Sequence, residues 1–198
     1  MKNLLPYYWI VLSIVIFSFS SCNKKENAQY ISLLQRQNTR LENLKTLSKL
    51  QHAGEGEVLK DIYVYDGDGD SIHFSRLLDD TKKIVFFFSE YSCSSCYTPF
   101  MKKMTEMYEE LKDKVIIVAG FESKRDFKIY MEDKKIPFAV YRTSKNFNIF
   151  PEFNDYSLVF LISRNMVIDN LMIIDQSNKE YIDNYLLIMN KKTVQNQK

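Results

Sequence analysis

Two cysteines, Cys93 and Cys96, are the side chains whose type and spacing most clearly suit chemical reactivity, and two serines separate them. An apolar run ends just before them and a helical pattern follows, so we expect them at the start of a helix. The free N–H groups and the positive end of the helix dipole stabilise a thiolate at that place. Cys93 should therefore ionise more readily than a free cysteine and attack a substrate disulfide. Cys96 should then displace the mixed disulfide.

Metal binding and a structural disulfide are the two other uses of such a cysteine pair. A structural zinc site needs four ligands, and the two histidines of the chain, His52 and His73, both come before the pair. A permanent structural disulfide suits an oxidising compartment, but a bridge that closes so small a loop constrains little chain entropy. The spacing therefore favours a redox role, with no metal at the site.

The composition is that of a globular protein. The chain has 198 residues, of which 45% are apolar and 26% are charged, so it is long enough for one domain with extensions. Its formal net charge is only +2. Proteins that bind nucleic acid usually need a basic face to neutralise phosphates, so this balance argues against a nucleic-acid partner.

The N-terminus has the order of a secretory signal. Lys2 precedes the apolar run Trp9–Phe17, and small residues lead from there to Cys22. The run is shorter than the roughly 20 apolar residues of a membrane-spanning helix. The segment from Phe19 to Cys22 resembles a bacterial lipobox, in which the cysteine is lipidated and becomes the mature N-terminus. A lipobox usually has leucine where Phe19 stands.

This resemblance implies a signal peptide over residues 1–21, lipidation of Cys22, and a domain anchored to the bacterial cell envelope and facing the periplasm. Several acyl chains would anchor the domain stably, since one chain gives only marginal membrane binding. The alternative is an uncleaved membrane anchor in which Cys22 has no role. Both interpretations place the domain outside the cytoplasm and next to a membrane.

Residues 22–54 are expected to link the anchor to the domain. The polar segment Asn23–Asn27 indicates a short tether, and Ala28–Gln51 has the pattern of an amphipathic helix without Gly or Pro. Gln37 and Ser48 interrupt the heptads, so a stable coiled coil is not expected. Gly54 should end the helix.

Residues 55–198 have the pattern of one α/β domain. A hairpin is predicted from Leu59–Tyr65 and Ser71–Phe74, joined by a turn rich in Asp and Gly. This turn lacks the glutamate and the flanking helices of a calcium loop. Further strands are predicted over 83–88, 115–119, 138–141, 158–162 and 166–174, and helices over 98–111, 123–134 and 177–190, with a short helix or loop over 143–150. Such strand–helix–strand units form a sheet with helices on its faces.

From about Leu59 to Met189 the sequence resembles the thioredoxin-like family, in particular the membrane-tethered thiol–disulfide reductases of the TlpA/ResA type and their lipoprotein relatives. The resemblance is carried by the hairpin, by Ile84–Phe88 leading into the cysteine pair, and by the segments Ile136–Val140 and Ser157–Ile162. It implies a thioredoxin-like fold: a central mixed sheet flanked by helices, with an N-terminal hairpin and a preceding amphipathic helix. It also implies a thiol–disulfide oxidoreductase that needs no bound cofactor and exchanges disulfides with partner proteins.

Two departures from the family pattern concern the surroundings of the dithiol. Family members usually carry a cis-proline beside it, where substrates dock, and Ser157 stands at that position. A cis bond without proline costs about 3 kcal/mol, so we expect a trans peptide there. Thioredoxins also bury an acid in the strand before the dithiol, and this chain has Phe87 there. Glu90 lies in the following loop, where it should be solvated.

A third departure lies in the dithiol segment, which has Ser92 in place of a bulky residue and no proline between the cysteines. Pro99 interrupts the expected helix near its start, and Thr98-Pro99 suits an N-cap and a first helical position. Peroxiredoxins share the fold but have Thr or Ser where Glu90 stands, and copper-delivery relatives have a wider cysteine spacing. The alternative to an oxidoreductase is a binding or accessory lipoprotein whose dithiol is structural or vestigial.

Overall fold

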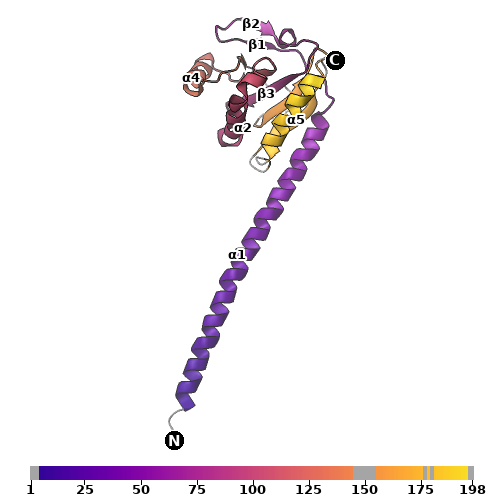
Figure 1. Ribbon diagram of the computed structural model, residues 1–198. Helices are drawn as coiled ribbons and strands as arrows, with labels where there is room; N and C mark the ends of the chain where they lie inside the picture. The colour runs from indigo at the N-terminus through magenta and orange to yellow at the C-terminus, as the bar shows by residue number, and fades with distance from the viewer. Residues whose placement is uncertain (1–4, 145–154, 176–177, 179–180, 196–198) are drawn as a thin grey trace. The chain divides into compact units, whose positions relative to one another are not determined.

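The computed structural model describes residues 5–144, 155–175, 178 and 181–195. The expected helix start at Ser177 and most of the segment 143–150 therefore lie outside the described residues. The chain groups into two compact units, Met1–Lys45 and Thr46–Lys198. Figure 1 shows the elements in chain order, from indigo at the N-terminus to yellow at the C-terminus.

The first unit is helical. Helix α1 runs from Leu5 to Gly54, so its last turns belong to the second unit. The tether expected at Asn23–Asn27 is helical, which corrects that prediction. No Gly or Pro occurs between Pro6 and Gly54, and Ala, Lys, Glu and Gln have high helix propensity. Within the described part of the chain, no helix combines the length and the apolar character needed to cross a bilayer.

The second unit is built on a mixed sheet, whose seven described strands have the order β2-β1-β5-β4-β3-β6-β7. The strands are β1 Tyr63–Tyr65, β2 Ser71–His73, β3 Lys83–Ser89, β4 Val115–Gly120, β5 Val140–Thr143, β6 Ser157–Ile162 and β7 Asp169–Ile174. β3, β4 and β5 are parallel, whereas β1, β2, β6 and β7 pair with their neighbours in antiparallel fashion. The predicted hairpin and mixed sheet are confirmed, with hairpin strands shorter than expected.

Helices alternate with the strands, as predicted. They are α2 Ser94–Glu106, α3 Tyr108–Leu111, α4 Lys124–Lys134 and α5 Ile182–Gln195, with a 3-10 helix η1 at Phe74–Leu77. The predicted N-cap of α4 is confirmed, because Ser123 Oγ accepts the N–H of Asp126. The described part of α5 begins at Ile182. After β7, the side chain of Asn178 accepts the N–H of Asp175 at 3.0 Å.

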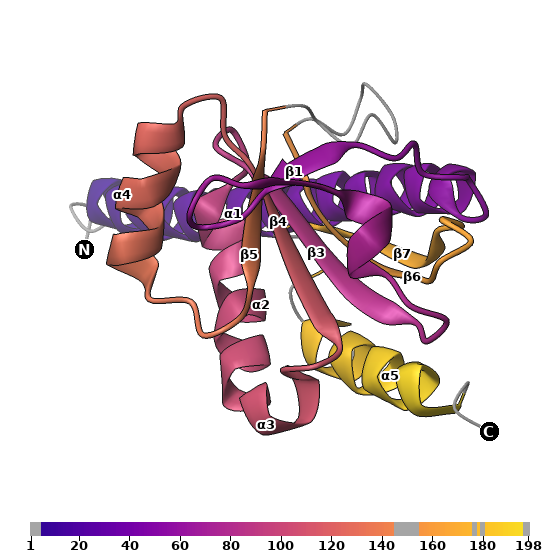
Figure 2. The ribbon, with the colours of Figure 1, turned by 90° about the horizontal axis from the view of Figure 1, so that it is seen from above.

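Alternating side chains of the central strands build one core on each face of the sheet. From β3, Phe86 and Phe88 lie in one core, and Val85 and Phe87 lie in the other. Three helices, α2, α4 and α5, cover the first face with Phe100, Met104, Phe127, Ile182, Leu186 and Met189. Figure 2 shows α2 and α5 on the same side of the sheet, where they contact each other. Burial on both faces thus accounts for the continuous apolar run of β3.

The opposite face is covered by the last turns of α1 and by η1. Leu47 and Phe74 are buried in this core, and Leu50 packs against it. Gln51 Nε2 donates to the carbonyl oxygen of Leu171 at 3.1 Å. These contacts explain why the second unit begins at Thr46, before the end of the helix.

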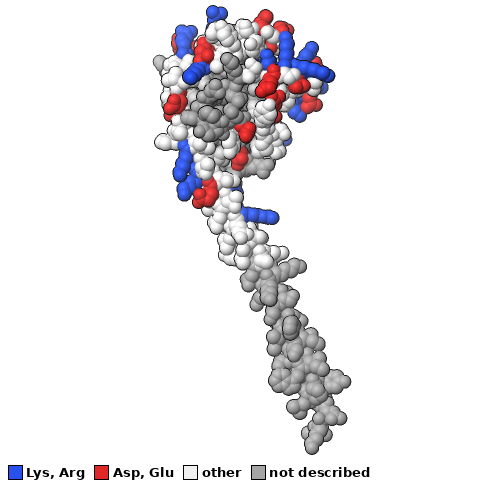
Figure 3. Space-filling model, turned by 180° about the vertical axis from the view of Figure 1, so that it is seen from behind, with Lys and Arg blue, Asp and Glu red and all other residues white. Residues whose placement is uncertain are grey.

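Charged side chains on the second unit are mixed in sign. Figure 3 shows Lys and Arg side chains next to Asp and Glu side chains on the face in view, without a broad surface of one sign. This distribution agrees with the net charge of +2.

Candidate active site

Two buried serines fix the turn between β3 and α2. Ser92 Oγ accepts the backbone N–H of Ser89 at 2.9 Å and lies 3.2 Å from Ser89 Oγ. The N–H of Ser92 donates to the carbonyl oxygen of Ser89 at 3.0 Å, and that of Glu90 donates to Gly120 of β4 at 2.9 Å. These bonds set the direction in which the chain enters α2. Neither serine was predicted as a site residue, and the signal for their role is a serine on each side of a sharp strand-to-helix turn.

Cys93 and Cys96 are joined by a disulfide at the start of α2, where their sequence positions place them. Their Cα atoms are 5.3 Å apart. Cys93 is the N-cap residue, and its carbonyl oxygen accepts the N–H groups of Cys96 at 3.0 Å and Tyr97 at 3.3 Å. Cys93 is exposed, whereas Cys96 is only 6% exposed. One cysteine is therefore open to a partner and the other is shielded, as attack by the first and resolution by the second require.

Pro99 lies inside α2 and not at its first position, which corrects the prediction for this residue. The helix starts earlier, at Ser94. Proline removes the N–H that would donate to the carbonyl oxygen of Ser95, four residues earlier in the helix. Thr98 Oγ1 donates to the carbonyl oxygen of Ser94 at 2.6 Å. The dithiol thus occupies the first turn of a helix that continues through the proline.

A hydroxyl group lies beside the exposed cysteine. Ser95 Oγ is 3.3 Å from Cys93 Sγ, which is within hydrogen-bonding range for sulfur. In the reduced protein a hydroxyl at this distance can donate to the Cys93 thiolate, and the N–H groups of the first helical turn act in the same direction. Both interactions should stabilise the Cys93 thiolate once the disulfide is reduced.

Replacing Ser95 with alanine should slow alkylation of reduced Cys93 at mildly acidic pH by about threefold, because the thiolate loses a hydrogen-bond donor. The rate is measured with iodoacetamide and peptide mass spectrometry, which reports on Cys93 and Cys96 separately. Ser94→Ala is the matched control, since it removes a neighbouring exposed hydroxyl and keeps Ser95, whose hydroxyl contacts Cys93 Sγ. Cys93 should react before Cys96 in all three proteins, and the reverse order would contradict the assigned roles.

One carboxylate, Glu90, lies on the turn that leads to the dithiol, and a second, Glu122, lies beside it on the loop between β4 and α4. Glu90 Oε1 is 3.5 Å from the backbone N–H nitrogen of Glu122. The negative charges of Glu90 and Glu122 raise the pKa of the exposed Tyr91 hydroxyl. Glu90 is exposed, so the prediction that it is solvated is confirmed. Because these charges oppose a nearby thiolate, stabilisation of Cys93 must come from the helix start and from Ser95.

Phe87 and Ser157, which stand at the positions of the family's acid and proline, are both buried. A side chain at Gly120 would come within 3.3 Å of the Phe87 ring, so this part of the core is closely packed. The register pairs Phe87 with Leu158, so Ser157 lies level with the C-terminal end of β3. The segment that carries the dithiol begins directly after this end. No peptide bond among the described residues is cis, so the one before Ser157 is trans, as expected.

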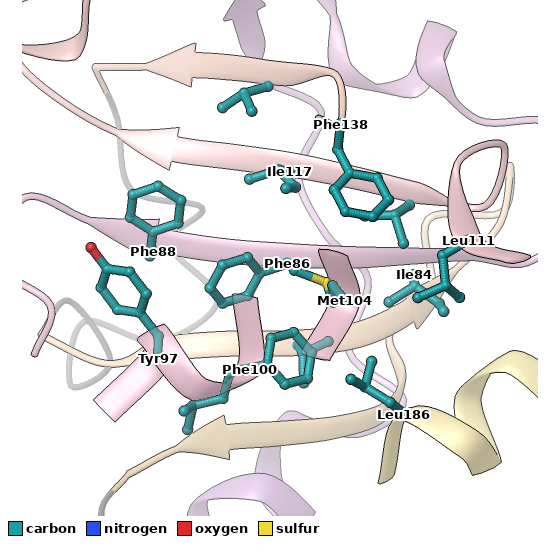
Figure 4. Close-up of a cluster of buried hydrophobic side chains, with 14 of the residues drawn as sticks. Ile84, Phe86, Phe88, Tyr97, Phe100, Met104, Leu111, Ile117, Phe138 and Leu186 are labelled. Atoms are coloured by element: carbon teal, nitrogen blue, oxygen red, sulfur yellow. The ribbon is translucent and has the colours of Figure 1, made fainter. Parts of the chain in front are cut away.

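An aromatic cluster supports the helix directly behind the dithiol. Tyr97 follows Cys96 and stacks on Phe88 with ring centroids 5.0 Å apart, as Figure 4 shows. Its hydroxyl lies 3.2 Å from that of Tyr130 on α4. Burial and the hydrogen bond with Tyr97 raise the pKa of Tyr130 far above its usual value, so the Tyr130 hydroxyl stays protonated. Neither tyrosine was predicted as a site residue, and a tyrosine directly after the second cysteine is the only sequence signal for this cluster.

The remaining predicted features concern metals and lipid. No group of three or more potential metal-ligating side chains occurs among the residues that the structure describes. The turn at Asp66 is closed by the residue's own side chain, whose Oδ1 accepts N–H groups from Asp68, Gly69 and Asp70. The predicted turn is therefore confirmed. Cys22 lies within α1, in the Met1–Lys45 unit.

Comparison with known proteins places this geometry in a structural context. No protein-family model matches the sequence, and a search of curated proteins finds no match. The structure is similar to a candidate thiol:disulfide interchange protein DsbE from Chlorobium tepidum, with a TM-score of 0.52 and 18% identity over 69% of this chain and 97% of that one. It is also similar to the peroxidoxin BcpB from Mycobacterium tuberculosis, with a TM-score of 0.51 and 13% identity over 71% and 96% of the two chains. These likenesses establish the fold alone.

Proposed function

We propose that this chain, which has the thioredoxin-like fold of these structures, is a lipid-anchored thiol–disulfide oxidoreductase that acts outside the cytoplasm. The asymmetry of the dithiol carries the proposal, since Cys93 is exposed at a helix start and Cys96 is shielded behind it. A pair that served only as a staple would contribute little, because it closes a very short loop. Disulfide exchange needs no bound cofactor.

The chemistry follows from the two positions. In the reduced protein the Cys93 thiolate attacks one sulfur of a partner disulfide, a new S–S bond forms, and the other partner sulfur leaves as a thiolate. Cys96 then gives up its proton and attacks Cys93 Sγ, which releases the second partner sulfur. Two electrons pass from the dithiol to the partner, and the Cys93–Cys96 disulfide seen in the structure is the oxidised product.

The measurement that tests this function is two-electron exchange between the full-length reduced chain and an oxidised protein such as insulin. Free thiols should appear on the partner as the Cys93–Cys96 disulfide forms. If the reduced chain reacts with none of the protein disulfides tested, the result would support the alternative, an accessory lipoprotein whose bridge is structural. Departures from the family at Phe87 and Ser157 favour slow exchange with few partners over broad reductase activity.

The proposal for the N-terminus divides the chain into a signal peptide at 1–21, a linking helix at 22–54 and the catalytic domain at 55–198. Its support is the sequence order of a basic residue, a short apolar run and small residues before Cys22. Acylation of Cys22 would hold the dithiol at a membrane surface of the cell envelope, where disulfides persist.

In membrane extracts from bacterial cells, the mature N-terminal peptide should begin at Cys22 and carry acyl chains. Mass spectrometry of this peptide measures both features. Cys22→Ala should abolish the acylated form and move the protein out of the membrane fraction, because the lipid supplies the anchor. Ser21→Ala is the control and should leave acylation intact, since alanine is also small. An unmodified chain that begins at Met1 would contradict the prediction.

A further inference from the structure

A groove of about 490 Å³ lies beside α2 on the flank that begins at the dithiol. One wall is α2 itself, with Tyr97, Met101 and Lys102. The other wall is the C-terminal end of α4 and the segment after it, with Tyr130 and residues 134–137. The groove therefore joins two parts of the chain that are far apart in sequence, and it begins one residue after Cys96.

The floor of this groove is apolar and firmly held. Tyr97 is buried, and Met101, Tyr130 and Ile136 pack against the core while remaining partly exposed. Phe88 contacts both tyrosine rings, with centroids 5.0 Å from Tyr97 and 5.4 Å from Tyr130. Since Phe88 belongs to β3, the floor is fixed to the strand that also leads into the dithiol. A partner would find this surface already formed, which lowers the entropy cost of binding.

The rim of the groove is basic. It is lined by three lysines, Lys102, Lys134 and Lys135, and by one acidic residue, Glu106. Lys134 pairs with its neighbour Asp133, whose carboxylate lies 2.8 Å from Nζ. Lys102 and Lys135 form no ion pair among the residues that the structure describes. The groove thus favours an apolar segment that carries negative charge.

The groove is within reach of a segment whose cysteine is attacked by Cys93. Met101 lies eight positions after Cys93 in the sequence of α2, and at 1.5 Å per residue this corresponds to about 12 Å along the helix. An extended chain spans about 3.3 Å per residue, so about four residues cover this distance. An acidic residue at the fourth or fifth position from the attacked cysteine would therefore meet Lys102.

We propose that the groove between α2 and the end of α4 docks the partner disulfide protein, and that it selects segments with apolar and acidic residues about four positions from the attacked cysteine. This inference rests on the proposed oxidoreductase function and names its substrate class. Its support is the apolar floor, the excess of lysines on the rim and the position of the groove directly behind the dithiol.

The test uses the reduced full-length chain in detergent and synthetic peptides with one central cysteine, activated as a mixed disulfide with thionitrobenzoate. The Cys93 thiolate attacks the peptide sulfur, and thionitrobenzoate leaves as a coloured thiolate. Cys96 then releases the peptide thiol as the Cys93–Cys96 disulfide forms. The acidic peptide has Leu at the third position and Asp-Glu at the fourth and fifth positions on both sides of cysteine. The amide peptide has Asn-Gln in their place.

At low salt the acidic peptide should react about fivefold faster than the amide peptide, and the preference should shrink at high salt, because exposed charges are screened. Exchanging the leucines for serine should also slow the acidic peptide. The double variant Lys102→Glu/Lys135→Glu should abolish or reverse the preference. Lys124→Glu/Lys128→Glu is the control. It changes the net charge by the same amount, but these two lysines line a different pocket, next to the hairpin turn, so this variant should keep the preference.

Equal rates for the two peptides, or a preference that survives the Lys102 and Lys135 changes, would overturn the docking proposal. Ellman's reagent, a small disulfide without flanking residues, separates this failure from failure of the function itself. If the reagent oxidises the dithiol while the peptides show no preference, the oxidoreductase function stands and the groove has no role. If neither the reagent nor any peptide reacts, both the function and the docking proposal are overturned.

Discussion

Replacing Cys93 with serine should reduce disulfide exchange below detection, whereas replacing Cys96 with serine should trap the partner as a stable mixed disulfide. The first change removes the exposed thiolate, and the shielded Cys96 has no open path to a protein disulfide. The second change leaves the attack intact but removes the group that resolves its product. Well-oriented groups in one molecule react with effective concentrations of about 10⁵ M or more, so external thiols should replace Cys96 poorly.

The trapped adduct is detected on non-reducing gels and located by mass spectrometry, and its partner is identified after reduction. The double variant Cys93→Ser/Cys96→Ser controls for adducts formed elsewhere in the chain and should show none. Ser94→Ala should behave like the unchanged protein, because the Ser94 side chain is exposed and has no part in the proposed exchange. A partner bound to Cys96 in the Cys93→Ser protein, formed as fast as the Cys93 adduct, would reverse the assigned roles.

The position of the dithiol could be predicted because the signals are local. The continuous apolar run of β3 is typical of a strand buried on both faces, and a helical pattern follows it directly. Cys93 and Cys96 were therefore predicted at the start of a helix, and the structure places Cys93 at the N-cap of α2 and Cys96 in its first turn. The sheet and its hairpin followed from the same kind of pattern, with errors of a few residues at the element ends.

Features that depend on neighbours distant in sequence could not be predicted in this way. Pro99 looked like a helix start, but α2 begins at Ser94, where the Ser89–Ser92 turn and the disulfide position its first turn. The hydroxyl contact between Tyr97 and Tyr130 needs α2 and α4 to lie on the same sheet face, which the order of the strands decides. The docking groove depends on that same arrangement, and no local pattern marks it.

Replacing Phe87 with aspartate should speed the resolving step by about 10²-fold while lowering the free energy of unfolding by about 3–5 kcal/mol. The acceleration is expected because the family pattern places at this position the acid that takes the proton of the resolving cysteine, and general-base help is typically worth about 10²–10⁴-fold. The loss of stability is expected because Phe87 is 2% exposed and packs closely over Gly120. Phe87 thus stabilises the core by packing at the position where the family has a carboxylate base.

The matched control is Phe87→Asn, which has the shape of aspartate without its charge and should lose similar stability without any acceleration. Resolution is followed by rapid mixing of the reduced chain with an activated mixed disulfide, and unfolding is followed by circular dichroism in urea. Burial should raise the pKa of the new carboxyl above its usual range, so the acceleration should appear as pH rises through that pKa and the base form accumulates. If the aspartate protein resolves no faster than the asparagine protein at any pH, proton removal from Cys96 does not limit exchange in this fold.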